Sequence, residues 1–419
     1  NIIKRCVSYD NGDKIVPIDQ AVQDQYTILF QSMSAKGFRL LAVAYRIMTK
    51  QPSYHVEDEE NLILSGFLVF ADPLLPDAAE VISSLKAEGV TIKILTGDNE
   101  LVSESICKEV GINPEHILLG NDIEQMSEQE LAAIAENTMV FARVSPSQKQ
   151  RIISALRSRG HVVGYIGDGI NDAPSLHSAD VGISVAGAVD VAREAADIIL
   201  LKPQLNVLLS GIIEGREAFG NVMKYLMMGT SSNFGNMFSM AAAFLFLPFL
   251  PMLPSQILLN NLLYDVSQLS IPTDYVDKKF SKKPRHWDLA VIRRFMLFIG
   301  PISSIFDFIT FYVMLHVFSA SIPMFQTGWF VESLATQTLV IFVIRTSQNP
   351  FRSHPSLPLV ITVISVVLIG CYLPFSPLSK LLGFTPLPVG YFIFLTSATL
   401  LYLFLVQMVK QKLIWRWFA

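Results

Sequence analysis

Three apolar runs in the first half of the chain each end in an aspartate at a turn. The runs are 66–71, 91–95 and 162–166, and the aspartates that follow them are Asp72, Asp98 and Asp168. Carboxylates placed after buried strands can hold a divalent cation against a phosphate group, and nearby glycines let backbone amides approach phosphate oxygens. The pattern therefore predicts Mg²⁺-assisted phosphoryl transfer.

The strongest of these signals is Gly-Asp-Gly-Ile-Asn-Asp-Ala-Pro at 167–174. Asp168 and Asp172 are the expected ligands of a catalytic Mg²⁺ cofactor, because carboxylate oxygens are the hard donors that this ion prefers. Gly167 and Gly169 leave room for close backbone contacts to oxygens. We regard this motif as specific, since it directly follows an apolar strand.

Two weaker signals support the same chemistry. Thr96 and Gly97, within Thr-Gly-Asp-Asn, could bind phosphoryl oxygens through a hydroxyl and an amide, although turns use these residues in any case. Lys149, within Ser-Pro-Ser-Gln-Lys, could neutralise the charge that develops during transfer. The alternative interpretation of Lys149 is the solvated first turn of a helix.

Helical segments such as 77–89 and 100–110 lie between the apolar runs. Alternation of strands and helices predicts an α/β fold with a doubly wound, mostly parallel sheet. Such sheets bind ligands at the carboxyl ends of their strands, which is where the motifs fall. The fold and the predicted chemistry are therefore consistent with each other.

Composition divides the chain into two halves. Of its 419 residues 51% are hydrophobic and 16% charged, which excludes an ordinary soluble protein and a disordered one. Residues 1–203 contain 45 of the charged side chains, and 204–419 contain 23. A net charge of −4 provides no basic field for nucleic acid, and three widely spaced cysteines suit a reducing interior.

The second half predicts six membrane spans. Residues 225–264 contain no charged side chain, and a proline-rich turn at 248–254 divides them into two helices. Four further spans are expected near 291–318, 328–346, 356–373 and 388–409. The connections on one side of the membrane contain twelve Lys and Arg residues, and those on the other side contain one. This difference predicts that the soluble half and the C-terminus are cytoplasmic.

Polar side chains within the spans predict a second ion site. Asn261 and Asp265 are four residues apart on one helix face, and Asn236 lies in the preceding span. Their oxygens suit Mg²⁺ or Ca²⁺, whereas the alternative is that the asparagines only join helices by hydrogen bonds. Asp307 and Glu332 are further intramembrane acids that could line a polar path.

The motifs resemble those of a known family. The segments 167–174, 96–99, 145–149 and 39–44 (Arg-Leu-Leu-Ala-Val-Ala) are similar to those of P-type cation-transporting ATPases. The phosphorylation domain of that family belongs to the haloacid dehalogenase superfamily. The resemblance covers nearly the whole chain. The runs that look most like the bacterial magnesium-importing branch are 231–249, 260–272, 300–307 and 328–332.

The resemblance implies a division into domains and an activity. Residues 1–65 would end a nucleotide-binding domain, 66–203 would form the haloacid-dehalogenase-like phosphorylation domain, 204–224 a stalk, and 225–419 a transmembrane domain of six spans. It implies a multi-pass protein of the cell (inner) membrane that couples ATP hydrolysis, through a phospho-aspartate, to Mg²⁺ transport into the cytoplasm.

The resemblance also implies roles for single residues. Arg39 matches the arginine that contacts ATP phosphates, and the expected ATP-binding set is Arg39, Thr96, Gly97 and Asp98. The expected catalytic residues are Thr96, Gly97, Lys149 and Asn171. The expected metal ligands are Asp168 and Asp172 for catalytic Mg²⁺, and Asn236, Asn261 and Asp265 for the transported cation.

The chain departs from the family pattern in informative places. The Asp-Lys-Thr-Gly-Thr motif with the phosphorylated aspartate is absent, so we expect the chain to be the C-terminal part of a longer pump, inactive without its N-terminal half. Asn236 stands where calcium pumps carry a glutamate, which lowers the negative charge of the site without proving Mg²⁺. The expected partners are ATP, the transported cation, membrane lipid and the missing half, and no nucleic acid.

Three alternatives remain open at the level of sequence. The first is a P-type pump for another divalent cation, and the second is an inactive truncated product. The third is a membrane-tethered phosphatase of the haloacid dehalogenase type. That enzyme would need its own nucleophilic aspartate, and no Asp-x-Asp motif follows a strand in 1–203.

Overall fold

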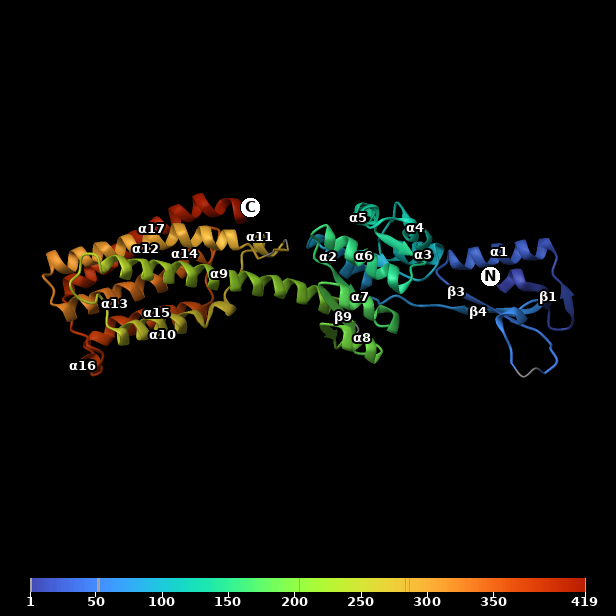
Figure 1. Ribbon diagram of the computed structural model, residues 1–419, viewed down its shortest axis with the longest axis horizontal. Helices are drawn as coiled ribbons and strands as arrows, with labels where there is room; N and C mark the ends of the chain where they lie inside the picture. The colour runs from blue at the N-terminus through green and yellow to red at the C-terminus, as the bar shows by residue number, and fades with distance from the viewer. Residues whose placement is uncertain (1, 51–52, 203, 283, 286, 419) are drawn as a thin grey trace. The chain divides into compact units, whose positions relative to one another are not determined.

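The computed structural model describes residues 2–50, 53–202, 204–282, 284–285 and 287–418. The chain separates into two compact units, 1–210 and 211–419. Figure 1 shows sheets with surrounding helices in the first unit and a bundle of long helices in the second. The predicted fold class, an α/β part followed by a helical part with membrane-type helices, is confirmed.

The first sheet of unit 1 is mixed. Its strand order is β2 (Ile15–Pro17), β1 (Cys6–Asp10), β4 (Leu62–Phe70), β3 (Arg39–Tyr45). β4 is parallel to β1 and antiparallel to β3, and helix α1 (Gln20–Ser34) contacts β3. The run that ends before Asp72 thus belongs to this sheet and not to a parallel one, because β3 offers it seven antiparallel residue pairs.

Two further sheets of unit 1 are parallel and contain three strands each. One has the order β5 (Ile94–Leu95), β7 (Val140–Ala142), β6 (Ile117–Leu119), and the other has the order β8 (Gly164–Ile166), β9 (Val181–Val185), β10 (Ile198–Leu200). The parallel arrangement agrees with the prediction. It forms two sheets instead of one, since β5 pairs only with β7, and β8 only with β9, among the described strands.

Helices alternate with the parallel strands. They are α2 (Ala78–Ala87), α3 (Glu100–Glu109), α4 (Gly120–Gln125), α5 (Glu128–Asn137), α6 (Pro146–Ser158), α7 (Ala173–Ser178) and α8 (Asp190–Ala195). All three residues of the middle strand β7 are fully buried, as expected for a parallel strand covered on both faces. Apolar side chains of α5 and α6 pack with β7, so this core fixes the loops at the strand ends.

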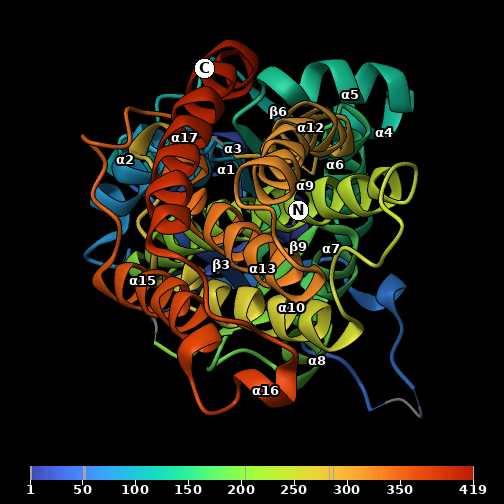
Figure 2. The ribbon, with the colours of Figure 1, turned by 90° about the vertical axis from the view of Figure 1, so that its left-hand side faces the viewer.

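The second unit is helical. Its helices are α9 (Asn206–Ala243, which starts shortly before the unit), α10 (Pro254–Gln268), α11 (Lys278–Ser281), α12 (Leu289–Tyr312), α13 (Ile322–Leu339), α14 (Ile341–Ile344), α15 (Leu357–Tyr372), α16 (Ser379–Leu382) and α17 (Val389–Phe418). α13 contacts α10, α12, α15 and α17, and Figure 2 shows it surrounded by its neighbours. It is therefore the central helix of the bundle.

Four segments of this unit are long and apolar enough to cross a membrane. They are Leu289–Val317, Ile322–Ile344, Leu357–Phe375 and Val389–Lys412, and they coincide with the last four of the six predicted spans. The first two predicted spans do fold as helices, α9 and α10. However, α10 has 15 residues, fewer than the roughly 20 that a bilayer requires. Six spans therefore stay a prediction.

Candidate phosphoryl-transfer and cation sites

The loop after β8 holds its two aspartates differently. Asp168 is exposed, whereas Asp172 is only 9% exposed. The loop turns back so tightly that a Cβ atom at Gly167 would lie 2.5 Å from the Cβ of Asp172, so this position requires glycine. The Gly169 amide donates to Asp172 Oδ2 at 3.2 Å. One carboxylate is thus presented to solvent while the other is fixed by the loop itself.

Lys149 reaches Asp172 from the start of α6. Ser145 caps this helix and Pro146 occupies its first turn, a combination that fixes where the helix begins. Lys149 Nζ lies 2.8 Å from Asp172 Oδ1, and the two side chains are 14% and 13% exposed. The lysine is therefore part of the strand-end site and not a solvated helix start. The pairing brings a positive charge next to the loop after β8, which carries the exposed carboxylate of Asp168.

Tyr165 on β8 also contacts Asp172, and sequence reasoning missed it. Its hydroxyl donates to Asp172 Oδ1 at 2.6 Å, and burial together with this carboxylate raises the pKa of Tyr165. Burial acts to raise the pKa of Asp172, but hydrogen bonds from Lys149 and Tyr165, the lysine charge and the loop amide lower it overall. Asp172 is thus ionised at neutral pH. A tyrosine in the strand just before the motif was the available signal.

Hydrogen bonds between its own residues hold the turn after β5 together. Thr96 Oγ1 donates to Asp98 Oδ2 and accepts from the Asp98 amide, both at 3.1 Å. Asn99 then caps α3 by accepting from two backbone amides. Gly97 is exposed, and a Cβ there would meet only the carbonyl oxygen of Val144, at 3.8 Å. Thr96 and Gly97 lie at a parallel strand end, as predicted, with the hydroxyl engaged within the turn.

Arg39 joins two of the three strand-end aspartates. Its Nη2 lies 2.5 Å from Asp98 Oδ2, and its Nη1 lies 3.9 Å from Asp72 Oδ2. Half of the arginine side chain is exposed, so these pairs contribute little to stability. Asp168 and Asn171 are exposed and make no side-chain hydrogen bond to this group within the described residues. The structure therefore forms two polar groups, one at Asp98 and one at Asp172.

The donor set after β8 fits Mg²⁺. Asp168 offers an exposed carboxylate in the same loop as the fixed carboxylate of Asp172. In phosphoryl-transfer sites Mg²⁺ commonly binds one or two carboxylates and completes its octahedron with water and phosphate. The described residues contain no group of three or more His, Cys, Asp and Glu placed to hold a metal.

No hydrogen bond joins the three predicted ligands of the transported cation to one another among the described residues. Asn236, on α9, is half-buried and accepts from Ser333 Oγ at 3.3 Å. Asn261 and Asp265, one turn apart on α10, are both exposed. The asparagine that α10 turns inward is Asn260, which donates to a backbone carbonyl of α13 at 3.3 Å. These side chains form no complete cation site within the described residues, and their role stays a prediction.

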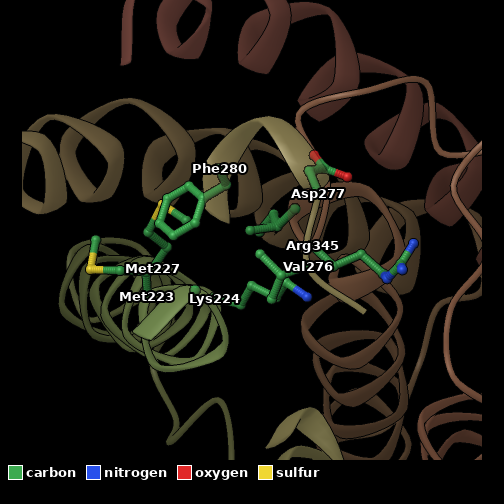
Figure 3. Close-up of a pocket in the computed structure, with 9 residues that line it drawn as sticks. Met223, Lys224, Met227, Val276, Asp277, Phe280 and Arg345 are labelled. Atoms are coloured by element: carbon green, nitrogen blue, oxygen red, sulfur yellow. The ribbon is translucent and has the colours of Figure 1, made fainter. Parts of the chain in front are cut away.

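A buried ionic cluster in the second unit was not predicted. Asp274, after α10, is enclosed and lies 2.6 Å from Lys224 Nζ and 2.8 Å from Arg345 Nε. Figure 3 shows the side chains around an adjacent cavity of about 20 Å³, with Lys224 on α9, Asp277 before α11 and Arg345 after α14. The cluster fastens α9 to two other segments. Sequence separations of 50 and 71 residues explain why no local pattern revealed it.

Comparisons with known proteins match the two halves of the chain separately. Residues 17–180 match the family of haloacid dehalogenase-like hydrolases, and residues 249–411 match the family described as cation transporting ATPase, C-terminus. The fold and these matches therefore define a unit of the haloacid dehalogenase type, followed in the same chain by a unit that matches the C-terminal part of cation transporting ATPases.

Individual relatives extend this result over almost the whole chain. The magnesium-transporting ATPase, P-type 1, of Escherichia coli K12 is 48% identical over 415 residues, covering 98% of this chain and 46% of that protein. Its namesake in Salmonella typhimurium LT2 is 48% identical over 418 residues, covering 97% and 46%. The calcium-transporting ATPase 1 of Bacillus cereus is 32% identical over 318 residues, covering 74% and 36%.

These matches show that the chain belongs to the P-type cation-transporting ATPases. The family resemblance inferred from the motifs is thereby confirmed. The chain spans about half the length of the curated magnesium-transporting relatives that it matches.

Proposed function

We propose that the chain is the C-terminal part of a P-type ATPase that couples ATP hydrolysis to Mg²⁺ transport into the cytoplasm. The observation that carries this proposal is the Lys149–Asp172 pair, 2.8 Å apart, beside the exposed Asp168. It lies at the carboxyl end of a parallel strand, where α/β sheets bind ligands. Identity of 48% to magnesium-transporting ATPases, against 32% to a calcium-transporting one, supports Mg²⁺ as the cargo.

The residues at this strand end have complementary proposed roles. Asp168 and Asp172 would hold catalytic Mg²⁺, which supplies charge neutralisation to the phosphate. Lys149, oriented by Asp172, stabilises the negative charge that develops on the transferred phosphoryl group. Thr96 and Gly97 orient phosphoryl oxygens at the end of β5, the glycine through its amide and the threonine through its hydroxyl, which exchanges Asp98 for phosphate.

The nucleotide is proposed to bind near the second polar group. Arg39 is half exposed and paired with Asp98, so it is able to exchange that carboxylate for a phosphate of ATP. Asp98 then contacts the nucleotide from the turn after β5. Asn171, exposed between the two Mg²⁺-binding aspartates, donates its amide to the phosphoryl group.

The phosphorylated aspartate is proposed to come from a segment outside this sequence. β5 and β8 each pair on one edge only among the described strands, and Ile166 on β8 is 41% exposed. An unpaired apolar strand edge favours addition of another strand. A strand added at these edges would end where Asp168 and Lys149 lie, which is where the nucleophile is needed.

The membrane unit is proposed to bind the transported Mg²⁺ through Asn236, Asn261 and Asp265. Asn261 and Asp265 share an exposed face of α10, which further transmembrane helices of a longer pump would cover. The proposed location is the inner membrane, with the first unit in the cytoplasm. This orientation is supported by the one-sided distribution of Lys and Arg in the connections.

The test is phosphorylation of the complete protein in lipid with ATP labelled in its terminal phosphate. We expect a phosphoenzyme in the wild type and its loss in Asp172→Asn, because the variant loses the lysine-oriented carboxylate. Asp190→Asn, at an aspartate side chain that is 81% exposed on α8, is the matched control and should label normally. Failure of the wild type to label, or normal labelling of Asp172→Asn, would contradict the proposal.

A further inference from the structure

Two acidic side chains meet inside the helical unit, apart from the predicted ligands of the transported cation. Asp307 on α12 is 1% exposed, and Glu332 on the central helix α13 is 0% exposed. The two helices pack against each other (Figure 2), and Trp329, one helical turn before Glu332 on α13, donates to Asp307 across this contact. Two buried acids on facing sides of one helix contact in an apolar bundle require a physical explanation.

The hydrogen-bond donors around this pair are unevenly distributed. Trp329 Nε1 donates to Asp307 Oδ1 at 2.7 Å, and Ser239 Oγ of α9 donates to Asp307 Oδ2 at 2.5 Å. Both carboxyl oxygens of Glu332 are buried and accept no hydrogen bond from the described residues. Ionised carboxylates only accept hydrogen bonds, so the two groups cannot satisfy each other as two anions.

The neighbouring side chains do not supply a compensating positive charge. The titratable groups that face the pair are Tyr391 and Tyr402, both on α17. The Tyr391 hydroxyl already donates to the Gly328 carbonyl. No ion pair found among the described residues includes either acid. Two adjacent charges without a cation are strongly unfavourable in such surroundings.

We propose that Asp307 and Glu332 form a proton-binding site, in which Glu332 is protonated and donates its hydrogen bond to Asp307. One proton removes one of the two charges and also provides the donor that Glu332 lacks. The site is distinct from Asn236, Asn261 and Asp265, and it does not depend on the proposed phosphoryl chemistry. Its ligand is a proton delivered by hydronium: one O–H bond of hydronium breaks, an O–H bond to a Glu332 carboxyl oxygen forms, and water is left.

A proton fits this site better than a divalent metal. Mg²⁺ requires about six oxygen ligands in an octahedron and gives up its water reluctantly. Both oxygens of Asp307 already accept hydrogen bonds from Trp329 and Ser239. The surrounding core is rich in aromatic rings, including Phe311, which lies 4.9 Å from Trp329 between ring centroids. The described residues gather no group of three or more His, Cys, Asp and Glu here for a metal, whereas a proton needs one donor and one acceptor.

Infrared spectroscopy of the full chain in lipid bilayers tests the proposal directly. The wild type at neutral pH should show the carbonyl band of a buried protonated carboxylic acid, shifted in D₂O. Glu332→Gln should lose this band, while Asp288→Asn, which alters an exposed helix cap at the start of α12, should retain it. Absence of the band in the wild type, or its persistence in Glu332→Gln, would overturn the proposal.

A second measurement distinguishes the proton from a purely structural role. The amide of Glu332→Gln has nearly the same shape as the acid and donates to Asp307 without a titratable proton. The thermal unfolding midpoint of the wild type should therefore fall more steeply than that of Glu332→Gln as the pH rises above the range in which a solvent-exposed glutamate ionises. Parallel pH profiles for the two proteins would overturn the proposal, even if both fold normally.

Discussion

Asp274 and Asp307 are both buried in the helical unit, yet their surroundings differ completely. Asp274 lies between Lys224 and Arg345, at 2.6 and 2.8 Å. Asp307 receives hydrogen bonds only from neutral donors and faces a second acid. A buried carboxylate that is paired with two cationic side chains holds segments of the chain together. A buried carboxylate without a cationic side chain can instead bind a cation reversibly, and for Asp307 with Glu332 that cation is a proton.

Asp172 in the first unit combines features of both environments. It has one fixed cation, Lys149, and neutral donors from Tyr165 and Gly169, next to the exposed Asp168. This arrangement leaves negative charge at the loop as a whole, which suits the proposed binding of a metal ion and phosphate there. The three aspartates thus range from fully compensated to uncompensated, and variants can test each position in this range.

The largest expected effect comes from removing the fully compensated acid. Asp274→Leu leaves Lys224 and Arg345 buried with no carboxylate between them, which should destabilise the full chain by about 3–5 kcal/mol. Chemical unfolding in detergent micelles measures this loss. Glu217→Leu, at an exposed position of α9, is the control and should change stability by less than about 0.5 kcal/mol. A similarly small loss of stability in Asp274→Leu would show that the buried ionic cluster does not hold the three segments together.

A somewhat smaller effect, on catalysis, is expected at the half-compensated site. Lys149→Met in the complete protein should lower ATP turnover by about 100–1,000-fold, the usual effect of losing one charge-stabilising group in the transition state. Steady-state ATPase assays measure it. Lys108→Met, which affects an exposed lysine paired with Glu104 on α3, should leave turnover within about 2-fold. Similar turnover in both variants would show that Lys149 only supports the loop.

The smallest expected effect concerns a single hydrogen bond. Tyr165→Phe removes one donor from Asp172 and should cost about 1–2 kcal/mol at neutral pH. Because the folded pKa of Asp172 is lowered, its contribution is present above the unfolded pKa and is lost as the pH falls through the folded pKa. The variant should therefore lose less stability than the wild type on acidification.

Unfolding curves of the full chain across the acid range check this prediction. Tyr45→Phe provides a matched control, since Tyr45 also donates to an aspartate, Asp10, but at an exposed site. It should leave the acid profile unchanged. Identical profiles for wild type and Tyr165→Phe would mean that the tyrosine does not hold Asp172 ionised.

Local sequence patterns predicted a large part of the strand-end site. Thr96 and Asp168 follow β5 and β8 as expected, because apolar runs between helices form parallel strands whose ends carry the loops. The approach of Lys149 to Asp172 agrees with this reasoning, since α6 starts at the end of β7. Tyr165 was missed because a strand tyrosine looks like any other apolar residue in a periodicity analysis.

Contacts between segments that are distant in the sequence could not be predicted from local sequence patterns. The cluster of Lys224, Asp274 and Arg345 depends on the packing of three distant segments, and hydropathy does not specify which helices are neighbours. The same holds for Asp307 and Glu332, which the sequence identified only as intramembrane acids. The run before Asp72 was assigned to the wrong sheet, because a strand's own residues do not reveal its partner.

The most direct test of the central claim is ATP-driven Mg²⁺ accumulation in sealed vesicles that contain the complete protein. If ATP hydrolysis and Mg²⁺ transport are coupled in one protein, accumulation requires both the strand-end site and the membrane ligands. Lys149→Met and Asp265→Asn should therefore each abolish accumulation. Glu217→Gln is the control and should accumulate Mg²⁺ normally. Accumulation at the wild-type rate in either Lys149→Met or Asp265→Asn would contradict this account.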